Sequence, residues 1–94
     1  MWSASLAWQI EFDPDARKEL KKLDRPIQSR LIAFLRDRLA PLDDPRSIGE
    51  ALAGSRLGNY WKYCVGDWRI VCDIQDHRVV VRVLRLGNRR EVYR

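Results

Sequence analysis

Basic and aromatic residues recur through the C-terminal half of the chain in a pattern that suits phosphate chemistry. Residues 51–94 carry nine Lys or Arg against four Asp or Glu, whereas residues 1–50 carry nine of each, so the net charge of +5 falls entirely in the second half. Cations bind the phosphates of single-stranded nucleic acid, and tyrosine rings stack on its bases. The candidates are Tyr60, Lys62, Arg69, Arg82, Arg89, Arg90, Tyr93 and Arg94. They predict a surface that binds single-stranded nucleic acid, with RNA as the expected ligand; the alternative is a basic face that serves only solubility.

Such residues could also cleave RNA without a metal ion or a histidine. RNA carries its own nucleophile, the 2′-hydroxyl, so an enzyme has only to position the phosphodiester, stabilise its developing charge and move two protons. Arginine can stabilise the charge, and a lysine or tyrosine with a lowered pKa can move a proton. We expect His77 to lie in a turn, and Asp43 and Asp44 beside Pro45 to form a turn rather than a metal site. The sequence therefore predicts neither a metal nor a cofactor.

The N-terminal half is expected to form one strand and two helices. Trp8, Ile10 and Phe12 alternate with polar residues, which predicts a half-buried strand. Asp13 and Pro14 then begin a helix, since an aspartate caps it and a proline fits its first turn. A second helix is predicted from residue 26 to Pro41, so the two helices should form a hairpin. Residues 42–53 are expected to be a loop with room for one short helical turn.

The C-terminal half is expected to form three antiparallel strands, over residues 59–65, 68–74 and 78–86. Gly66-Asp67 suits a two-residue hairpin turn, which pairs Val65 with Trp68 and fixes the register. Alternation then divides the side chains between two faces. One face should be the core, with Trp61, Tyr63, Val65, Trp68, Ile70, Cys72, Val79, Val81 and Val83. The other should be uncovered, with Tyr60, Lys62, Cys64, Arg69, Val71, Asp73, Val80, Arg82 and Leu84.

These elements predict one α+β domain over residues 1–94. Its four-stranded, mostly antiparallel sheet should carry the helix hairpin on one face, in the order β-α-α-β-β-β. Cys64 and Cys72 fall on opposite faces, so we expect them to stay reduced. Residues 1–10 lack the basic start and apolar core of a signal peptide, and no apolar run approaches a membrane span. A cytoplasmic protein is expected.

Several short motifs of the chain resemble the RelE branch of the RelE/ParE toxins of bacterial toxin–antitoxin modules. The resemblance covers residues 8–94, and its most specific parts are VGDWRI at 65–70 and RREVY at 89–93. The other motifs are WQIEF at 8–12, ARKELKKL at 16–23, DPR at 44–46, LAG at 52–54 and YWKY at 60–63. The resemblance implies a ribonuclease that enters the ribosomal A site, cleaves messenger RNA and is silenced by a RelB-like antitoxin.

The resemblance also implies roles for individual residues. Lys62 would act in proton transfer or charge stabilisation, Arg69 would contact the scissile phosphate, Arg89 would stabilise phosphate or leaving group, and Tyr93 would stack on or deprotonate the nucleotide. Cys64 stands where relatives usually have a second basic residue, so one charge of the site is missing. The chain ends at Arg94 and lacks the C-terminal helix of some members. The alternative function is that of a ParE-like toxin, which inhibits DNA gyrase by binding and has no nuclease activity.

Overall fold

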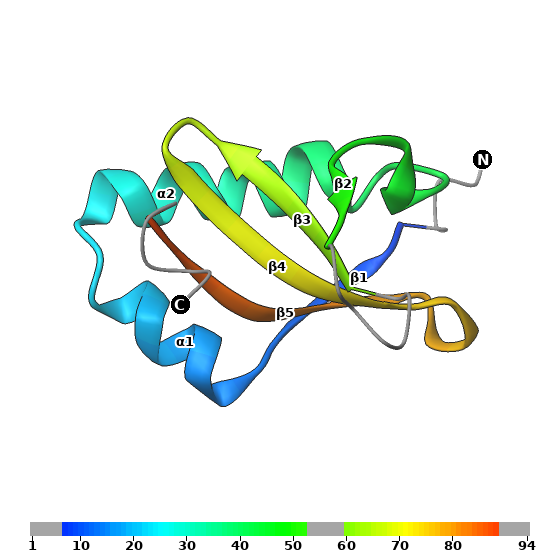
Figure 1. The fold of residues 1–94 in the computed structure, drawn as a ribbon, viewed down its shortest axis with the longest axis horizontal. Coiled ribbons are helices and arrows are strands. Elements are labelled where there is room, and N and C mark those ends of the chain that lie inside the picture. The colour runs from blue at the N-terminus through cyan, green and yellow to red at the C-terminus, as the bar shows by residue number, and fades with distance from the viewer. Residues whose placement is uncertain (1–6, 53–59, 89–94) are drawn as a thin grey trace.

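The computed structural model describes residues 7–52 and 60–88, in which two helices pack on a five-stranded sheet (Figure 1). The helices are α1 (Pro14–Lys21) and α2 (Arg25–Ala33), and the strands are β1 (Gln9–Phe12), β2 (Glu50–Ala51), β3 (Tyr60–Val65), β4 (Trp68–Gln75) and β5 (Val80–Asn88). The strand order is β1-β5-β4-β3-β2, with β1 parallel to β5 and the other pairs antiparallel. The predicted α+β class is confirmed. The predicted count of four strands was wrong, because β2 forms within the expected loop.

The two helices begin where the sequence predicts but take different positions on the sheet. The Asp13 carboxylate caps α1 by accepting a hydrogen bond from the Asp15 N–H at 3.1 Å, and a proline lies in the first turn of each helix. Helix α1 packs beside β5 and β1, whereas α2 runs behind β3 and β4 in Figure 1. The expected hairpin is therefore splayed, and each helix covers its own part of the sheet. In the described ranges, neither helix is long and apolar enough to cross a membrane.

The second helix widens into a π-helix over Phe34–Leu39 before it ends ahead of Pro41. The Ala40 N–H donates to the Leu35 carbonyl at 2.9 Å, five residues back, which defines the wider turn. Leu35 and Leu39 remain buried in this segment. The Ala40 carbonyl in turn accepts the Trp8 N–H at 2.8 Å, so the end of the helix holds the chain that enters β1.

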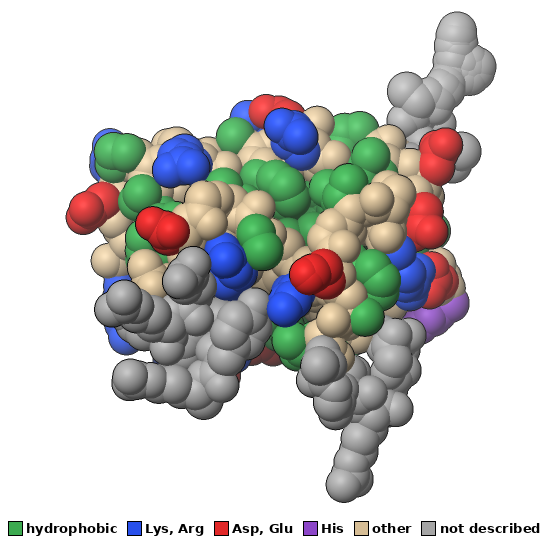
Figure 2. All heavy atoms as spheres, turned by 45° about the horizontal axis from the view of Figure 1, so that its top comes forward, with side chains coloured by type: hydrophobic (Ala, Val, Ile, Leu, Met, Phe, Trp, Pro, Cys, Tyr) green, Lys and Arg blue, Asp and Glu red, His purple; other side chains and the backbone are tan. Residues whose placement is uncertain are grey.

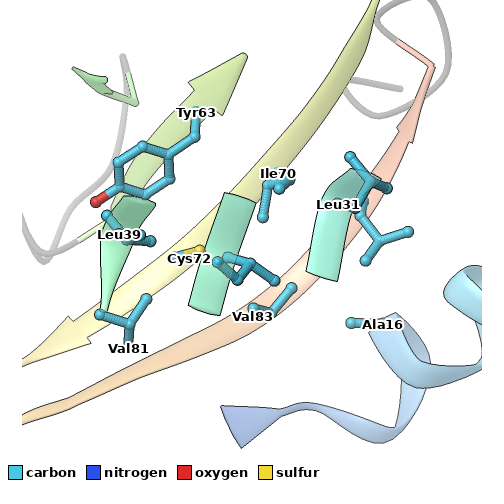
Figure 3. Close-up of a cluster of buried hydrophobic side chains, with 10 residues drawn as sticks. Ala16, Leu31, Leu39, Tyr63, Ile70, Cys72, Val81 and Val83 are labelled. Carbon is cyan, nitrogen blue, oxygen red and sulfur yellow. The ribbon is translucent and has the colours of Figure 1, made fainter. Parts of the chain in front are cut away.

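The β3–β4 hairpin has the predicted register, with Val65 opposite Trp68, Tyr63 opposite Ile70 and Lys62 opposite Val71. The side of the sheet that packs against α2 is called the inner face here, and the opposite side the outer face. Figure 3 shows the core on the inner face. Its members are Ala16, Leu31, Leu35, Leu39, Tyr63, Ile70, Cys72, Val81, Val83 and Leu86.

The turn before β5 differs from the prediction. Residues Asp76–Arg78 form a 3-10 turn, and Val79 adopts a left-handed conformation (φ 55°) with 43% of its surface exposed. The prediction of Val79 in the core was therefore wrong, because the turn is longer than two residues and Val79 is part of it rather than of β5. The neighbouring Val80 lies on the predicted outer side, but that face was expected to be uncovered, and both Val80 and Val71 are buried on it, with 2% and 6% of their surfaces exposed.

An irregularity in β5 changes which residues of that strand reach the core. Cys72 pairs with Val83 and Val71 with Arg85, so Leu84 is an extra residue without an opposite partner. Such a bulge shifts the alternation by one residue. Leu86 consequently joins the core, while Arg85 and Gly87 continue the outer face.

The edge of β5 is closed by two different elements in succession. Strand β1 pairs with residues 80–83 and then turns away at Asp13, whose N–H donates to the Val83 carbonyl at 2.8 Å. Beyond that point, Glu19 of α1 accepts the Leu86 N–H at 3.1 Å and a hydrogen bond from Arg85 at 3.3 Å. A carboxylate thus takes the place of the missing neighbouring strand.

Candidate nucleic-acid interface

The outer face brings together two of the predicted catalytic residues. Lys62 on β3 lies opposite Val71 on β4, and Arg69 lies two residues from Val71 on the same strand. Lys62 and Arg69 are therefore diagonal neighbours, which places their Cα atoms about 7–8 Å apart. In the part of the chain that the structure describes, both helices lie on the inner side or at the β5 edge (Figure 1). The geometry leaves these two cations on one accessible side of the sheet.

Arg69 is anchored to its own hairpin turn. Its Nη1 donates to the carbonyls of Gly66 at 2.9 Å and of Trp68 at 3.1 Å. These bonds use one of the three guanidinium nitrogens, so the donors on Nε and Nη2 point elsewhere. Gly87 lies opposite Arg69 on β5, and no described atom comes within 4 Å of the place where a Cβ of Gly87 would stand. The hairpin holds the guanidinium in place, and the missing side chain leaves room beside it.

Lys62 is half-buried between strands β2 and β4, where Glu50 of β2 is its direct partner in the ladder. Gly49 makes this pairing possible, because it has a φ of 79° and a Cβ there would come within 2.5 Å of the Lys62 carbonyl oxygen. The same Cβ would lie 2.7 Å from the Tyr63 ring. Sequence analysis missed Gly49 and Glu50 as neighbours of the site. Their only signal was a glycine followed by an acidic residue in an apparent loop.

Arg82, predicted to bind RNA, is held in ion pairs at the β1 end of the outer face. Its guanidinium contacts Glu11 at 3.3 Å and Asp13 at 3.1 Å, and Arg78 contacts the same Glu11 at 2.9 Å. Tyr60 is half-buried opposite Asp73. Acidic residues therefore balance the cations at this end, a role for Arg82 that alternation alone did not indicate. Its contact with RNA remains a prediction, as does that of Tyr60.

The remaining predicted site residues, Arg89, Arg90, Tyr93 and Arg94, lie outside the described residues. The described chain stops at Asn88, which pairs with Trp68 and so adjoins Arg69. Cys64 is exposed opposite Arg69, and Cys72 is buried; both are reduced, as expected. Burial raises the pKa of the Cys72 thiol. The exposed cysteine is thus the one at the site.

Other polar groups have structural roles. The Tyr63 hydroxyl donates to the Pro45 carbonyl at 2.7 Å, and burial raises the pKa of this phenol, so it stays protonated. Asp44 accepts the Arg46 N–H at 2.9 Å and begins a 3-10 turn over Pro45–Ser47, which confirms the expected turn. Arg46 also holds Asp76 at 2.8 Å, and that hydrogen bond lowers the pKa of the Asp76 carboxyl.

The charges of this region are mixed in sign. Figure 2 shows Lys and Arg interspersed with Asp, Glu and hydrophobic side chains. Within residues 7–52 and 60–88, no three His, Cys, Asp or Glu side chains lie close enough together to hold a metal ion. His77 is exposed in its turn, away from the Lys62–Arg69 pair on the sheet. The arrangement can bind a phosphate and place an amine beside it.

This fold, a pair of helices packed on a mostly antiparallel five-stranded sheet, is a RelE-like fold. The family model described as "ParE toxin of type II toxin-antitoxin system, parDE" matches residues 10–93. The chain therefore belongs to the RelE/ParE superfamily of toxins of type II toxin–antitoxin systems, as the resemblance predicted. A search of curated protein sequences found no match.

Solved structures agree with this assignment. The toxin–antitoxin complex RelBE2 from Mycobacterium tuberculosis has a chain with a TM-score of 0.77 and 24% identity, covering 87% of this chain and 91% of that one. The isolated RelE toxin of E. coli has a TM-score of 0.69 and 26% identity, and the match covers 87% of this chain and 84% of that one. A chain of the intact E. coli RelBE complex has a TM-score of 0.69 and 27% identity, and the match covers 87% of this chain and 96% of that one. The family model points to ParE and the structures to RelE, so the superfamily is established and the branch is not.

Proposed function

We propose that this toxin is a metal-independent, ribosome-dependent endonuclease that cleaves messenger RNA in the ribosomal A site and so inhibits translation. The observation that carries the proposal is the diagonal pair Lys62 and Arg69 on the outer face, beside the open space at Gly87. Arg69 can stabilise the developing charge of a phosphate, and Lys62 lies near enough to act on the same group. Its cognate partner would be a RelB-like antitoxin, because two similar solved structures are toxin–antitoxin complexes, and it would act in the bacterial cytoplasm.

In the proposed reaction the 2′-oxygen attacks the adjacent phosphorus and the P–O5′ bond breaks. The products are a 2′,3′-cyclic phosphate and a 5′-hydroxyl. The 2′-hydroxyl proton passes to a base, and the leaving 5′-oxygen takes up a proton from an acid. Arg69, held by its turn, would bind the phosphate oxygens as their charge grows. Lys62 would stabilise the same charge or transfer a proton, and the resemblance adds Arg89 and Tyr93 to these roles.

A second function, inhibition of DNA gyrase by binding, is favoured by one observation, the match to the ParE family model. The two functions separate cleanly in vitro. Purified toxin is incubated with ribosomes programmed with a defined message, and new 5′ ends are mapped; in parallel, supercoiling by gyrase is measured with the same toxin. We expect cleavage within the A-site codon and unchanged supercoiling. Inhibited supercoiling with an intact message would overturn the nuclease proposal.

A further inference from the structure

The bulge at Leu84 places a further cation, Arg85, on the outer face of the sheet. Arg85 pairs with Val71 on β4, and Val71 pairs with Lys62 on β3, so these three residues form one row across the sheet. Arg69 is a diagonal neighbour of both Lys62 and Arg85, at about 7–8 Å from each. Regular alternation along β5 would instead turn residue 85 toward the core. The structure therefore brings Arg85 to the Lys62–Arg69 pair, which the sequence pattern did not indicate.

The outer face has no side chain between the two arginines of this group. Gly87 is the next outer-face residue of β5 after Arg85, and it lies directly opposite Arg69. No described atom comes within 4 Å of the place where a Cβ of Gly87 would stand. Arg69 and Arg85 therefore flank a position that a larger residue would fill. An oxygen atom of a bound anion can approach the backbone there.

Glu19 of α1 draws the Arg85 side chain toward the β5 edge. The Nη2 atom of Arg85 donates to Glu19 Oε2 at 3.3 Å, and the Leu86 N–H donates to Oε1 of the same carboxylate at 3.1 Å. Because the carboxylate is held at both oxygens, it fixes the direction in which the arginine extends. That direction leads away from Lys62, which lies two strands farther into the sheet. Arg85 is thus placed beside the Lys62–Arg69 pair rather than over it.

The two arginines of β5 differ in how accessible they are. Arg82 lies 3.3 Å from Glu11 and 3.1 Å from Asp13, and 31% of its side chain is exposed. The Arg85 side chain is 44% exposed and lies 3.3 Å from Glu19. An exposed ion pair of this kind contributes little to stability. Of these two arginines, Arg85 is therefore the one that an anion from solvent reaches more easily.

A phosphate group is the anion that suits this arrangement. A guanidinium group presents several N–H donors in one plane, which match the oxygens of a phosphate. Proteins bind single-stranded RNA with cations that follow its backbone, so that successive phosphates meet successive positive charges. Arg69 and Arg85 lie on neighbouring strands and on either side of Gly87. Their spacing suits two successive phosphates of one RNA strand.

We propose that Arg85 binds the phosphate next to the scissile one, so that the message runs from the Lys62–Arg69 pair over Gly87 to the β5 edge. The proposal rests on the nuclease function above and extends the site by one nucleotide. A neighbouring phosphate does not change its charge during the reaction, so its contact is equally strong in the ground state and in the transition state. Arg85 therefore strengthens the binding of the message and leaves the chemical step unchanged.

The test uses the full chain and three single variants. Arg85→Gln removes the proposed contact, Glu19→Gln breaks the same ion pair but keeps the arginine, and Arg78→Gln removes one positive charge from the β4–β5 turn. Binding to a fluorescent single-stranded RNA, 2′-O-methylated so that it has no nucleophile, is measured by anisotropy over a range of salt concentrations. We expect Arg85→Gln to bind about tenfold more weakly at low salt, with a log–log salt slope shallower by about 0.7.

The two control variants separate this contact from stability and from net charge. Glu19→Gln should bind the RNA at least as tightly as the wild type, because a negative charge beside the arginine is lost. Arg78→Gln should keep the wild-type salt slope. A wild-type slope in Arg85→Gln would overturn the proposal. An equal loss in Glu19→Gln would assign the effect to the broken ion pair, and an equal loss in Arg78→Gln would assign it to net charge; either result would also overturn it.

Single-turnover cleavage on ribosomes separates the two proposals. Arg85→Gln should need more ribosomes for its half-maximal rate and should reach the wild-type maximal rate, because only uniform binding is lost. A lower maximal rate would overturn the assignment of Arg85 to a neighbouring phosphate. If the wild-type protein does not cleave the message at all, the nuclease proposal fails, while the RNA-binding measurement still decides whether Arg85 contacts a phosphate.

Discussion

Arg69 and Ile70 follow one another on β4 but serve opposite faces of the sheet. Ile70 is fully buried among the core residues, whereas Arg69 is half-exposed and bonds to its own turn. The inner face is uniformly apolar and held by packing. The outer face is mixed: Arg82 is held in ion pairs at its β1 end, whereas Arg69 is held by backbone carbonyls near the hairpin turn. The same alternation thus builds a stabilising face and a face whose cations differ in availability.

The largest expected effect is on the inner face. Ile70→Ala removes a fully buried side chain and leaves a cavity, so the free energy of unfolding should fall by about 2 to 5 kcal/mol. Val79→Ala is the matched control, because that side chain is 43% exposed, and it should cost far less. Urea denaturation followed by tryptophan fluorescence measures both. Equal losses in the two variants would contradict the division into faces.

On the outer face the expected effect is on catalysis. Arg69→Ala should slow single-turnover cleavage by about 10²- to 10³-fold, the usual cost of losing a donor that stabilises transition-state charge. The melting temperature should change little. Arg78→Ala, which removes an ion-paired arginine from the β4–β5 turn, should leave the rate near that of the wild type. Cleavage that survives Arg69→Ala would remove this residue from the mechanism.

Gly49, just before β2, allows the backbone to pass close to Lys62 and Tyr63, where a side chain would clash. Gly49→Ala should lower the free energy of unfolding by about 1 to 3 kcal/mol, because it forces a left-handed residue and a clash with the Lys62 carbonyl. Gly87→Ala is the control, since no described atom opposes its Cβ. Urea denaturation followed by tryptophan fluorescence measures both variants. A Gly87→Ala protein as unstable as Gly49→Ala would show that the difference between the two sites is not steric.

The smallest effect concerns an ion pair in an exposed turn. Arg46 lowers the pKa of Asp76, so the pair stabilises the fold above the ordinary aspartate pKa of about 3.9 and loses that contribution as the pH falls through the lowered value. Asp76→Asn should therefore cost under about 1 kcal/mol at pH 7 and nothing near pH 2. Unfolding measured at both pH values checks this. A destabilisation that grew toward acid pH would show that the ionised Arg46–Asp76 pair does not stabilise the fold.

The sequence was sufficient for the parts of the fold that depend on local rules. Gly66-Asp67 set the β3–β4 register, and Asp13-Pro14 set the start of α1. It was insufficient where one residue shifts a pattern. The bulge at Leu84 moved Leu86 into the core, and Val79 lengthened a turn by taking a left-handed conformation that β-branched residues rarely adopt.

The candidate site was predicted in the same uneven way. Alternation placed Lys62 and Arg69 on one face because both lie in the well-specified hairpin. It could not show that Arg82 meets Glu11 and Asp13, since that pairing depends on a parallel contact between the two ends of the chain. Glu50 was missed because a two-residue strand has no periodicity to read.

Glu19 has a consequence for the behaviour of this protein in a crowded solution. An unpaired strand edge is a template on which a second chain can add, and the route to aggregates often begins there. Along β5 the Leu86 N–H, which lies beyond the end of β1, donates to the Glu19 carboxylate, and the same carboxylate pairs with Arg85. A single side chain from α1 thus occupies an edge amide that an added strand would otherwise pair with, without lengthening β1 by even one residue.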